Sequence, residues 1–466
     1  MTVTHCDNMG NILQLQTTVV RNPWNNVVVA ELAVDSPRQA QAKLAAAWAY
    51  HPNLSCEQRY HILSRARQLL QQNKPEIAVL ISEESGLSLQ DTYDEVEIAC
   101  VVLHYAAEQA LLMAAENCPS AGHSETNADI HFSRRSPLSG IIAAITSFNH
   151  PLAQVVCKVA PAIVTNNRIV LNPCEKTPSS ALALHKILSE AGMPSKMFTL
   201  VNCSVAAFLN LVVAQRYIDL LSFTGCPAAG EEVARKVTGC KLTLEIDSND
   251  TMIIAADADL KQAAALAARG AFSCSGQRSS AIRRVLVDRR CHAAFVRCLA
   301  EEAQSYRTGN PLDTDVKLGT LIDEISAAEI EQRIRISVNQ GACCVTGNQR
   351  DGAMLTATVL TGVTADMPLM AKATFGPVAL VTPYTSIESA IRKANDAGLA
   401  GNVSVITCDQ QLISRFMKEL QVAKVIINGI PGFYSEELSA DGVSFSANKY
   451  QESMTECCLA YTCPQS

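Results

Sequence analysis

The sequence predicts an α/β protein with two parallel-sheet domains, and three observations lead to this fold class. The chain has 466 residues, more than one ordinary compact core accommodates, so two or three domains are expected. Its hydrophobic content of 48% against a charged content of 18% is typical of a globular protein with a large interior. Short apolar runs rich in β-branched residues alternate with helical stretches, and this alternation is typical of parallel sheets covered by helices.

The elements follow in a regular order along the chain. Residues 36–118 are predicted to be mainly helical because Ala- and Leu-rich stretches recur there, and the polar residues 119–136 form an excursion. A first set of alternating strands and helices is expected at 140–145, 152–164, 168–171, 179–191, 198–201, 205–214, 220–223 and 241–245. A second set has strands at 252–254, 285–287, 378–381, 403–406 and 425–427, and the tail from 431 is expected to be irregular.

Composition excludes several classes of partner and site. The net charge of −7 gives no global basic field for nucleic acid or an anionic membrane. The polar segment 1–11 has no signal-peptide pattern, and the apolar runs are too short to cross a bilayer. The 18 cysteines form no Cys-x-x-Cys pair, which indicates reduced thiols in a cytoplasmic protein and predicts no metal site.

Six short motifs occur in a fixed order, and a seventh segment at 272–279 reads Phe-Ser-Cys-Ser-Gly-Gln-Arg-Ser. The six are Ser-Phe-Asn-His-Pro-Leu at 147–152, Pro-Cys-Glu-Lys-Thr-Pro at 173–178, Ser-Phe-Thr-Gly at 222–225 with Gly230, Leu-Glu at 244–245, Phe-Gly-Pro-Val at 375–378, and Ala-Asn with Gly-Leu at 394–399. In this order they resemble the landmarks of the aldehyde dehydrogenase superfamily. The resemblance spans nearly the whole chain.

The resemblance implies a fold with a Rossmann-like cofactor domain, an α/β catalytic domain and a small oligomerisation arm. The expected NAD(P)-binding domain comprises residues 1–118 and 137–246, and the catalytic domain comprises 247–430. The arm comprises 119–136 and 431–466. By resemblance the arm adds a strand to a neighbour's sheet, so a homodimer or homotetramer is expected.

The resemblance also implies the catalytic residues. In this family a cysteine attacks the aldehyde carbon, and the oxyanion is held by an Asn amide and by the backbone N–H of the nucleophile. A glutamate then activates water. On this chain these positions are Ser279 in place of the cysteine, Asn149 as the oxyanion donor and Glu245 as the base.

The cofactor implied is NAD or NADP, with contacts at Glu175, Gly225, Gly230 and Phe375. The two glycines are expected to bring a helix N-terminus to the pyrophosphate, where unpaired N–H groups favour an anion.

The Asn-His-Pro-Leu form is most similar to the branch that oxidises small anionic aldehydes such as phosphonoacetaldehyde or lactaldehyde. His150 and Arg278 are the expected substrate contacts. Each also has a structural interpretation, with Arg278 in an ion pair and His150 in a packed loop.

Several positions depart from the family pattern. Ser279 replaces the nucleophile, Ala373 replaces a glutamate that binds the nicotinamide ribose, and Asn172 replaces a lysine that binds the adenosine ribose. Asp-Ser at 247–248 replaces a Gly-Gly pair beside the base. A serine hydroxyl is a weak nucleophile without an adjacent base, so NAD(P)-dependent oxidation is expected to be weak or lost.

The alternative interpretation is a catalytically inactive pseudoenzyme that acts as an interaction or regulatory subunit. Cys274, five residues before Ser279, is a possible substitute thiol, but its place in the loop favours a packed cysteine. Asn149 and Glu245 likewise have the alternative of tying loops together or of being an unused carboxylate.

Overall fold

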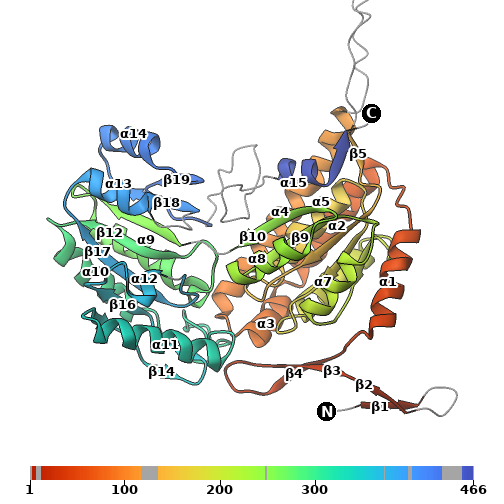
Figure 1. Ribbon diagram of the computed structural model, residues 1–466, viewed down its shortest axis with the longest axis horizontal. Coiled ribbons are helices and arrows are strands. Elements are labelled where there is room, and N and C mark those ends of the chain that lie inside the picture. Colours follow the sequence, from red (N-terminus) through yellow and green to blue (C-terminus); the bar gives the residue numbers. More distant parts are fainter. Residues whose placement is uncertain are drawn as a thin grey trace, which may run out of the picture.

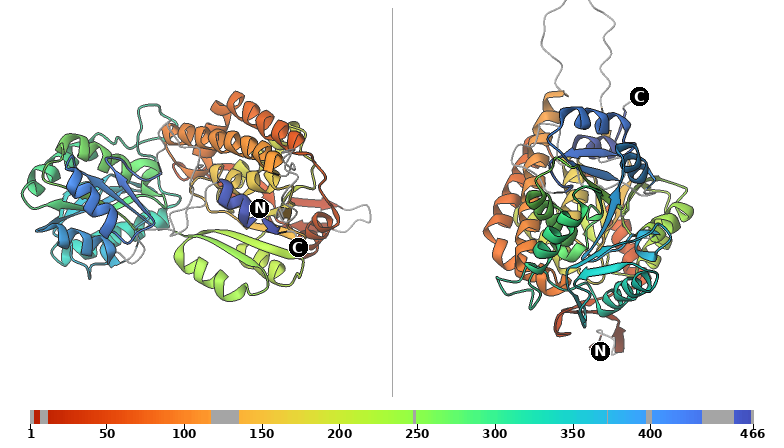
Figure 2. Two further views of the ribbon diagram at one scale, coloured as in Figure 1. Left: turned by 90° about the horizontal axis from the view of Figure 1, so that it is seen from above. Right: turned by 90° about the vertical axis from the view of Figure 1, so that its left-hand side faces the viewer.

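Two α/β lobes lie side by side in the computed structural model, and each is built around its own sheet (Figures 1 and 2). The structure describes residues 3–6, 12–116, 135–246, 249–371, 373–396, 401–432 and 454–464. Most of the predicted arm, the Asp-Ser pair at 247–248 and the Gly-Leu pair at 398–399 lie outside these residues. The predicted α/β class is confirmed, whereas the exact domain boundaries stay a prediction.

The sheet of the first lobe has five parallel strands in the order β10-β9-β6-β7-β8. These are β6 (Ile141–Ile145), β7 (Ile169–Asn172), β8 (Phe198–Leu200), β9 (Ile218–Gly225) and β10 (Lys241–Ile246). Along the chain, the central strand β6 comes first, β7 and β8 follow on one side of it, and β9 and β10 then follow on the other side. In such sheets ligands bind outside the carboxyl ends of the two strands where the order reverses, here β6 and β9.

Helices cover both faces of this sheet, which explains why its strands read as continuous apolar runs. One face packs against α2 (Cys56–Gln72), α3 (Lys74–Ser85), α4 (Leu89–Glu116), α5 (Ala153–Val164) and α6 (Ser179–Glu190). The other face packs against α1 (Pro37–Ala49), α7 (Val205–Val213) and α8 (Pro227–Lys236). Alternate residues of β6 enter the two cores, Ile142 the first and Ile141 the second.

Helix α4 is apolar enough over Leu89–Met113 to cross a membrane by length and composition alone. In the fold, however, Val96, Ala99 and Leu103 of this helix are buried against α2 and α5. Packing in a protein core therefore accounts for its composition, and the helix does not argue for a membrane span.

The sheet of the second lobe has seven strands in the order β13-β16-β17-β12-β11-β18-β19, and only the β13–β16 pair is antiparallel. The strands are β11 (Asp250–Ile254), β12 (Ile282–Asp288), β13 (Cys343–Thr346), β16 (Thr358–Thr361), β17 (Val378–Tyr384), β18 (Asn402–Ile406) and β19 (Lys424–Ile427). The helices are α9 (Leu260–Phe272), α10 (His292–Gln304), α11 (Glu324–Asn339), α12 (Pro368–Ala371), α13 (Ile387–Asn395) and α14 (Gln410–Glu419).

Short elements complete the fold. Two hairpins precede the first lobe, and a third joins two loop segments; they are β1 (Val3–Cys6) with β2 (Ile12–Leu15), β3 (Thr17–Arg21) with β4 (Val28–Ala33), and β14 (Arg350–Asp351) with β15 (Met354–Leu355). The expectation of an irregular tail is wrong over residues 454–464, which form α15 (Met454–Ala460) and β20 (Thr462–Pro464). β20 pairs with β5 (Arg135–Pro137), so two segments assigned largely to the arm meet although the 324 residues from 138 to 461 lie between the two strands.

Candidate active site

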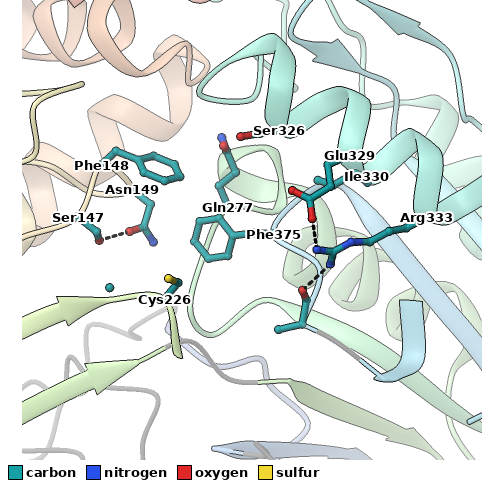
Figure 3. Close-up of a pocket in the computed structure, with 12 residues that line it drawn as sticks. Ser147, Phe148, Asn149, Cys226, Gln277, Ser326, Glu329, Ile330, Arg333 and Phe375 are labelled. Atoms are coloured by element: carbon teal, nitrogen blue, oxygen red, sulfur yellow. Dashed lines mark hydrogen bonds and ion pairs between the residues drawn. The ribbon is translucent and has the colours of Figure 1, made fainter. Parts of the chain in front are cut away.

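A cavity of about 210 Å³ lies between the two lobes, at the carboxyl ends of β6 and β9 (Figure 3). The first lobe contributes Asn149 and its two preceding residues after β6, together with Gly225 at the end of β9 and Cys226 after it. The second lobe contributes Gln277, one face of α11, and the segment with Ala373 and Phe375. Three of the predicted site residues, Asn149, Gly225 and Phe375, therefore lie around one cavity.

The Asn149 side chain is 5% exposed and is held in one orientation. Its Oδ1 accepts hydrogen bonds from Ser147 Oγ at 2.6 Å and from Gln154 Nε2 at 3.1 Å. An amide presents its oxygen and its N–H2 group on different sides, so fixing the oxygen directs the donors elsewhere. Figure 3 shows the nitrogen on the cavity side, which suits the predicted oxyanion donor.

Glu245 is held by two donors from neighbouring elements. The parallel register of β9 and β10 sets Glu245 beside Thr224, whose Oγ1 donates to Glu245 Oε2 at 2.6 Å. Lys158 of α5 lies 3.4 Å from the same oxygen, and its Nζ also donates to Ser222 Oγ at 2.9 Å. Because the Lys158 side chain is only 2% exposed, its charge needs these partners. The predicted base is thus part of a small polar network.

The turn after β9 has the features expected of an anion site. A Cβ at Gly225 would lie 2.5 Å from the Phe223 ring, and a Cβ at Gly230 would lie 2.7 Å from Ile246, so both sites need glycine. Helix α8 starts with Pro227, and its N-cap Cys226 makes no side-chain capping bond. First-turn N–H groups are therefore not satisfied by that cap, and the N-cap residue Cys226 lines the cavity.

The loop before Ser279 is a left-handed turn, η1 (Ser273–Gly276), with positive φ values of 53°, 53° and 66° at Cys274, Ser275 and Gly276. A Cβ at Gly276 would lie 2.1 Å from the carbonyl oxygen of Gly376. Gln277, the next residue, makes hydrogen bonds through both polar atoms of its side-chain amide. Its Nε2 donates to the Thr320 carbonyl at 3.4 Å, and its Oε1 accepts from the N–H of Ile322 at 2.9 Å. The backbone that leads to position 279 is therefore fixed.

Ser279 itself is half-buried and follows this turn, outside the residues that line the cavity. Cys274 is 6% exposed, and burial, followed by the nearby Asp91 carboxylate, raises the pKa of its thiol well above the ordinary range. A thiolate is therefore disfavoured at position 274. The structure favours a packed cysteine there over a substitute nucleophile.

The two predicted substrate residues each have an acidic neighbour. Arg278 is 3% exposed and donates to Ser280 Oγ at 3.1 Å and to the Pro431 carbonyl at 2.9 Å. Its charge also lowers the pKa of Asp91, although burial dominates and raises that pKa to about 6. His150 adopts a left-handed φ of 80°, and its Nδ1 lies 3.6 Å from Oε2 of the buried Glu95.

The predicted cofactor contacts are only partly preserved. Phe375 meets Phe148 edge-to-face across the cavity, with the ring centroids 5.8 Å apart, whereas Glu175 is exposed on the loop after β7. Asn172 is fully buried, and its Nδ2 donates to the carbonyls of Val201 and Cys203, so its amide is turned into the protein.

Three contributions to the site were missed by the sequence interpretation, namely Lys158, the Glu95 carboxylate, and the pair Glu329–Arg333 on α11. A single lysine inside the apolar stretch 152–164 was a usable signal, because a buried charge requires a partner. No local sequence pattern marks the other three residues, Glu95, Glu329 and Arg333. Over the ranges that the structure describes, no group of three or more His, Cys, Asp or Glu side chains is arranged to hold a metal.

Comparisons with known proteins agree with this arrangement. A model of the aldehyde dehydrogenase family matches residues 13–466. The chain is 31% identical over 444 residues to a 3-sulfolactaldehyde dehydrogenase of Priestia aryabhattai, covering 94% of this chain and 93% of that protein. It is 29% identical over 444 residues to a lactaldehyde dehydrogenase of Methanococcus aeolicus, covering 94% of each.

A solved structure, the glyceraldehyde-3-phosphate dehydrogenase GapN of Methanocaldococcus jannaschii complexed with NADP, superposes with a TM-score of 0.87. It is 26% identical, and the match covers 96% of this chain and 97% of that one. The cleft between two lobes, the ordered motifs and these matches together establish that the chain belongs to the aldehyde dehydrogenase family.

Proposed function

We propose that this chain binds NAD or NADP together with a small aldehyde in the cleft between its lobes. We further propose that oxidation of the aldehyde to the acid is weak or lost because Ser279 stands at the nucleophile position. The observation that carries the proposal is the fixed Asn149 amide, whose donors lie on the cavity side while its oxygen is bonded behind. Such a preorganised donor stabilises negative charge that develops on a carbonyl oxygen.

The residues around the cavity fit a dinucleotide. The N-terminus of α8, approached through Gly225, offers N–H donors to a pyrophosphate. Phe375 provides an aromatic face, and the exposed Glu175 provides a carboxylate for a ribose hydroxyl. When bound, the dinucleotide supplies the hydride acceptor. The NADP complex of the related GapN structure supports the same ligand here.

Glu245 is proposed as the base that takes a proton from water. Thr224 and Lys158 both contact Oε2, which holds the carboxylate at the edge of β10 in a defined position. The carboxylate form of a glutamate side chain is the form that accepts a proton from water.

We propose that the substrate is a small aldehyde. Whether it carries an anionic group can be tested by comparing charged with neutral aldehydes. Relatives are named for 3-sulfolactaldehyde, which has a sulfonate group, and for lactaldehyde, which is neutral. His150 and Arg278 are the proposed contacts for an anionic group. Glu95 lies beside His150 and Asp91 lies near Arg278, and acidic neighbours oppose an anionic ligand, so an anionic aldehyde is expected to gain only modestly over a neutral one.

A second candidate function is that of an inactive interaction or regulatory subunit. It is favoured by the inward turn of Asn172 and by the absence of a carboxylate at Ala373 and of a thiol at Ser279. In either case we propose a cytoplasmic homodimer or homotetramer. The free thiols of the cysteines whose side chains are described support that compartment.

The deciding experiment is calorimetric titration of the unmodified protein with NAD+ and with NADP+. We expect binding of at least one dinucleotide, followed by background turnover of sulfolactaldehyde and lactaldehyde, and by clear turnover in Ser279→Cys. Turnover of the unmodified protein as fast as the cysteine variant would contradict the weak-oxidation proposal. Absence of dinucleotide binding at millimolar concentration would leave the regulatory-subunit proposal.

A further inference from the structure

Helix α11 of the second lobe contributes one acidic and one basic side chain to the lining of the cavity. Glu329 and Arg333, one turn apart, form an ion pair, and both side chains line the cavity together with Phe375 (Figure 3). Neither residue was expected at the site from the sequence motifs. Their carboxylate and guanidinium are the charged groups among the residues that line this cavity.

The pair is tied to the segment that bears Phe375. Arg333 Nη1 donates to the Ala373 carbonyl at 3.1 Å while Nη2 donates to Glu329 Oε1. The Arg333 side chain is 21% exposed and the Glu329 side chain 58%, so the arginine is the better-anchored member. An ordinary solvent-exposed ion pair at this spacing contributes little to stability. Here, in contrast, Arg333 holds the Glu329 carboxylate and also bonds the backbone of Ala373, a residue that has no carboxylate of its own.

The chemistry of a carboxylate allows it to serve a second partner. Its two oxygens offer about four lone-pair sites, so Glu329 can retain Arg333 and still accept hydrogen bonds from two neighbouring hydroxyls. A ribose presents two adjacent hydroxyl groups of this kind. The methyl side chain of Ala373 can accept no hydrogen bond, although this position faces the same cavity.

We propose that Glu329, positioned by Arg333, binds the ribose next to the nicotinamide and replaces the carboxylate that position 373 lacks. The cofactor contact would then come from α11 and not from the segment before Phe375. This inference rests on the proposed dinucleotide function.

Calorimetry on the full chain tests the assignment with two ligands. The ligands are the dinucleotide that the unmodified protein binds and ADP, which carries the adenosine side without the nicotinamide ribose. We expect Glu329→Gln to weaken dinucleotide binding about tenfold, as for the loss of a charge-assisted hydrogen bond, and to leave ADP affinity unchanged. Adding Ala373→Glu to that variant should restore much of the lost affinity.

The matched control is Glu331→Gln, on the same helix. Glu331 pairs with Arg335 and Arg350 and does not line the cavity, so this variant should bind both ligands as the unmodified protein does. Equal dinucleotide affinity of Glu329→Gln and the unmodified protein would overturn the assignment and leave the proposed function standing. An equal loss for ADP would also overturn it, because the effect would then be general. If the unmodified protein binds neither ligand, the proposed function fails and the inference with it.

Discussion

The buried carboxyl of Glu84 predicts a defined pH dependence of stability. Glu84 is 2% exposed, and its two oxygens accept the N–H of Ser179, at the start of α6, at 3.2 and 3.0 Å. A helix N-terminus favours an anion by at most about 2 kcal/mol. Burial outweighs this effect and raises the pKa of Glu84 from 4.5 to about 7. The shift corresponds to about 3 kcal/mol, at 1.36 kcal/mol per pH unit.

The direction of this pH dependence follows from whether the folded or the unfolded state keeps the Glu84 proton. Between pH 4.5 and about 7 the folded protein retains the Glu84 proton, whereas the unfolded chain has released it. The free energy of unfolding therefore falls as pH rises through this window and is lowest above it. Glu84→Gln cannot titrate, so its stability relative to the unmodified protein should increase by up to about 3 kcal/mol between pH 5 and pH 8.

Urea unfolding followed by circular dichroism at pH 5, 6, 7 and 8 measures this difference. Glu76→Gln, an exposed residue on the same helix α3, is the control and should follow the unmodified protein. Asp91, whose pKa burial raises to about 6, titrates in all three proteins and cancels in the comparison. A stability difference between Glu84→Gln and the unmodified protein that stays constant with pH would refute the reasoning.

Three further experiments test the site and the loop that leads to it. Lys158→Met and Glu245→Gln should be non-additive in a double-mutant cycle by about 0.5–3 kcal/mol of unfolding free energy, and additive losses would show that the contact is not energetically coupled. Gly276→Ala should cost about 2–5 kcal/mol in thermal unfolding because strain and a backbone clash add, whereas Gly192→Ala, with nothing within 4 Å of its Cβ, should cost only about 1–2 kcal/mol. Similar costs would contradict the clash. Asn149→Ala, made in the variant with a cysteine nucleophile, should reduce aldehyde turnover about 10²–10³-fold, and an equal loss of dinucleotide affinity would instead make it a cofactor contact.

Much of the fold was predictable because it depends on local pattern. The buried strands of the first sheet, such as 141–145, read as apolar runs bounded by turn residues, and their alternation with helices required parallel pairing. Short elements such as β13 (Cys-Cys-Val-Thr) and β20 (Thr-Cys-Pro) were not predicted because three or four residues without an apolar run carry too little signal.

The site was predictable only where a motif names a residue. Asn149, Gly225 and Phe375 follow from short motifs, and the fold brings them to one cavity. The contact between Lys158 and Glu245 spans 87 positions and joins a helix to a strand. No local pattern encodes such a pairing, since it arises only when the sheet register is set.

The fixed amide of Asn149 also bears on how this chain can change over evolutionary time. Its two bonding partners, Ser147 and Gln154, belong to the first lobe and do not involve the residue at position 279. The Asn149 amide is therefore kept in place whichever residue stands at position 279. Serine and cysteine codons can differ by a single base, so under the proposed function a silent and a reactive form of this protein lie one mutational step apart, with no loop to rebuild between them.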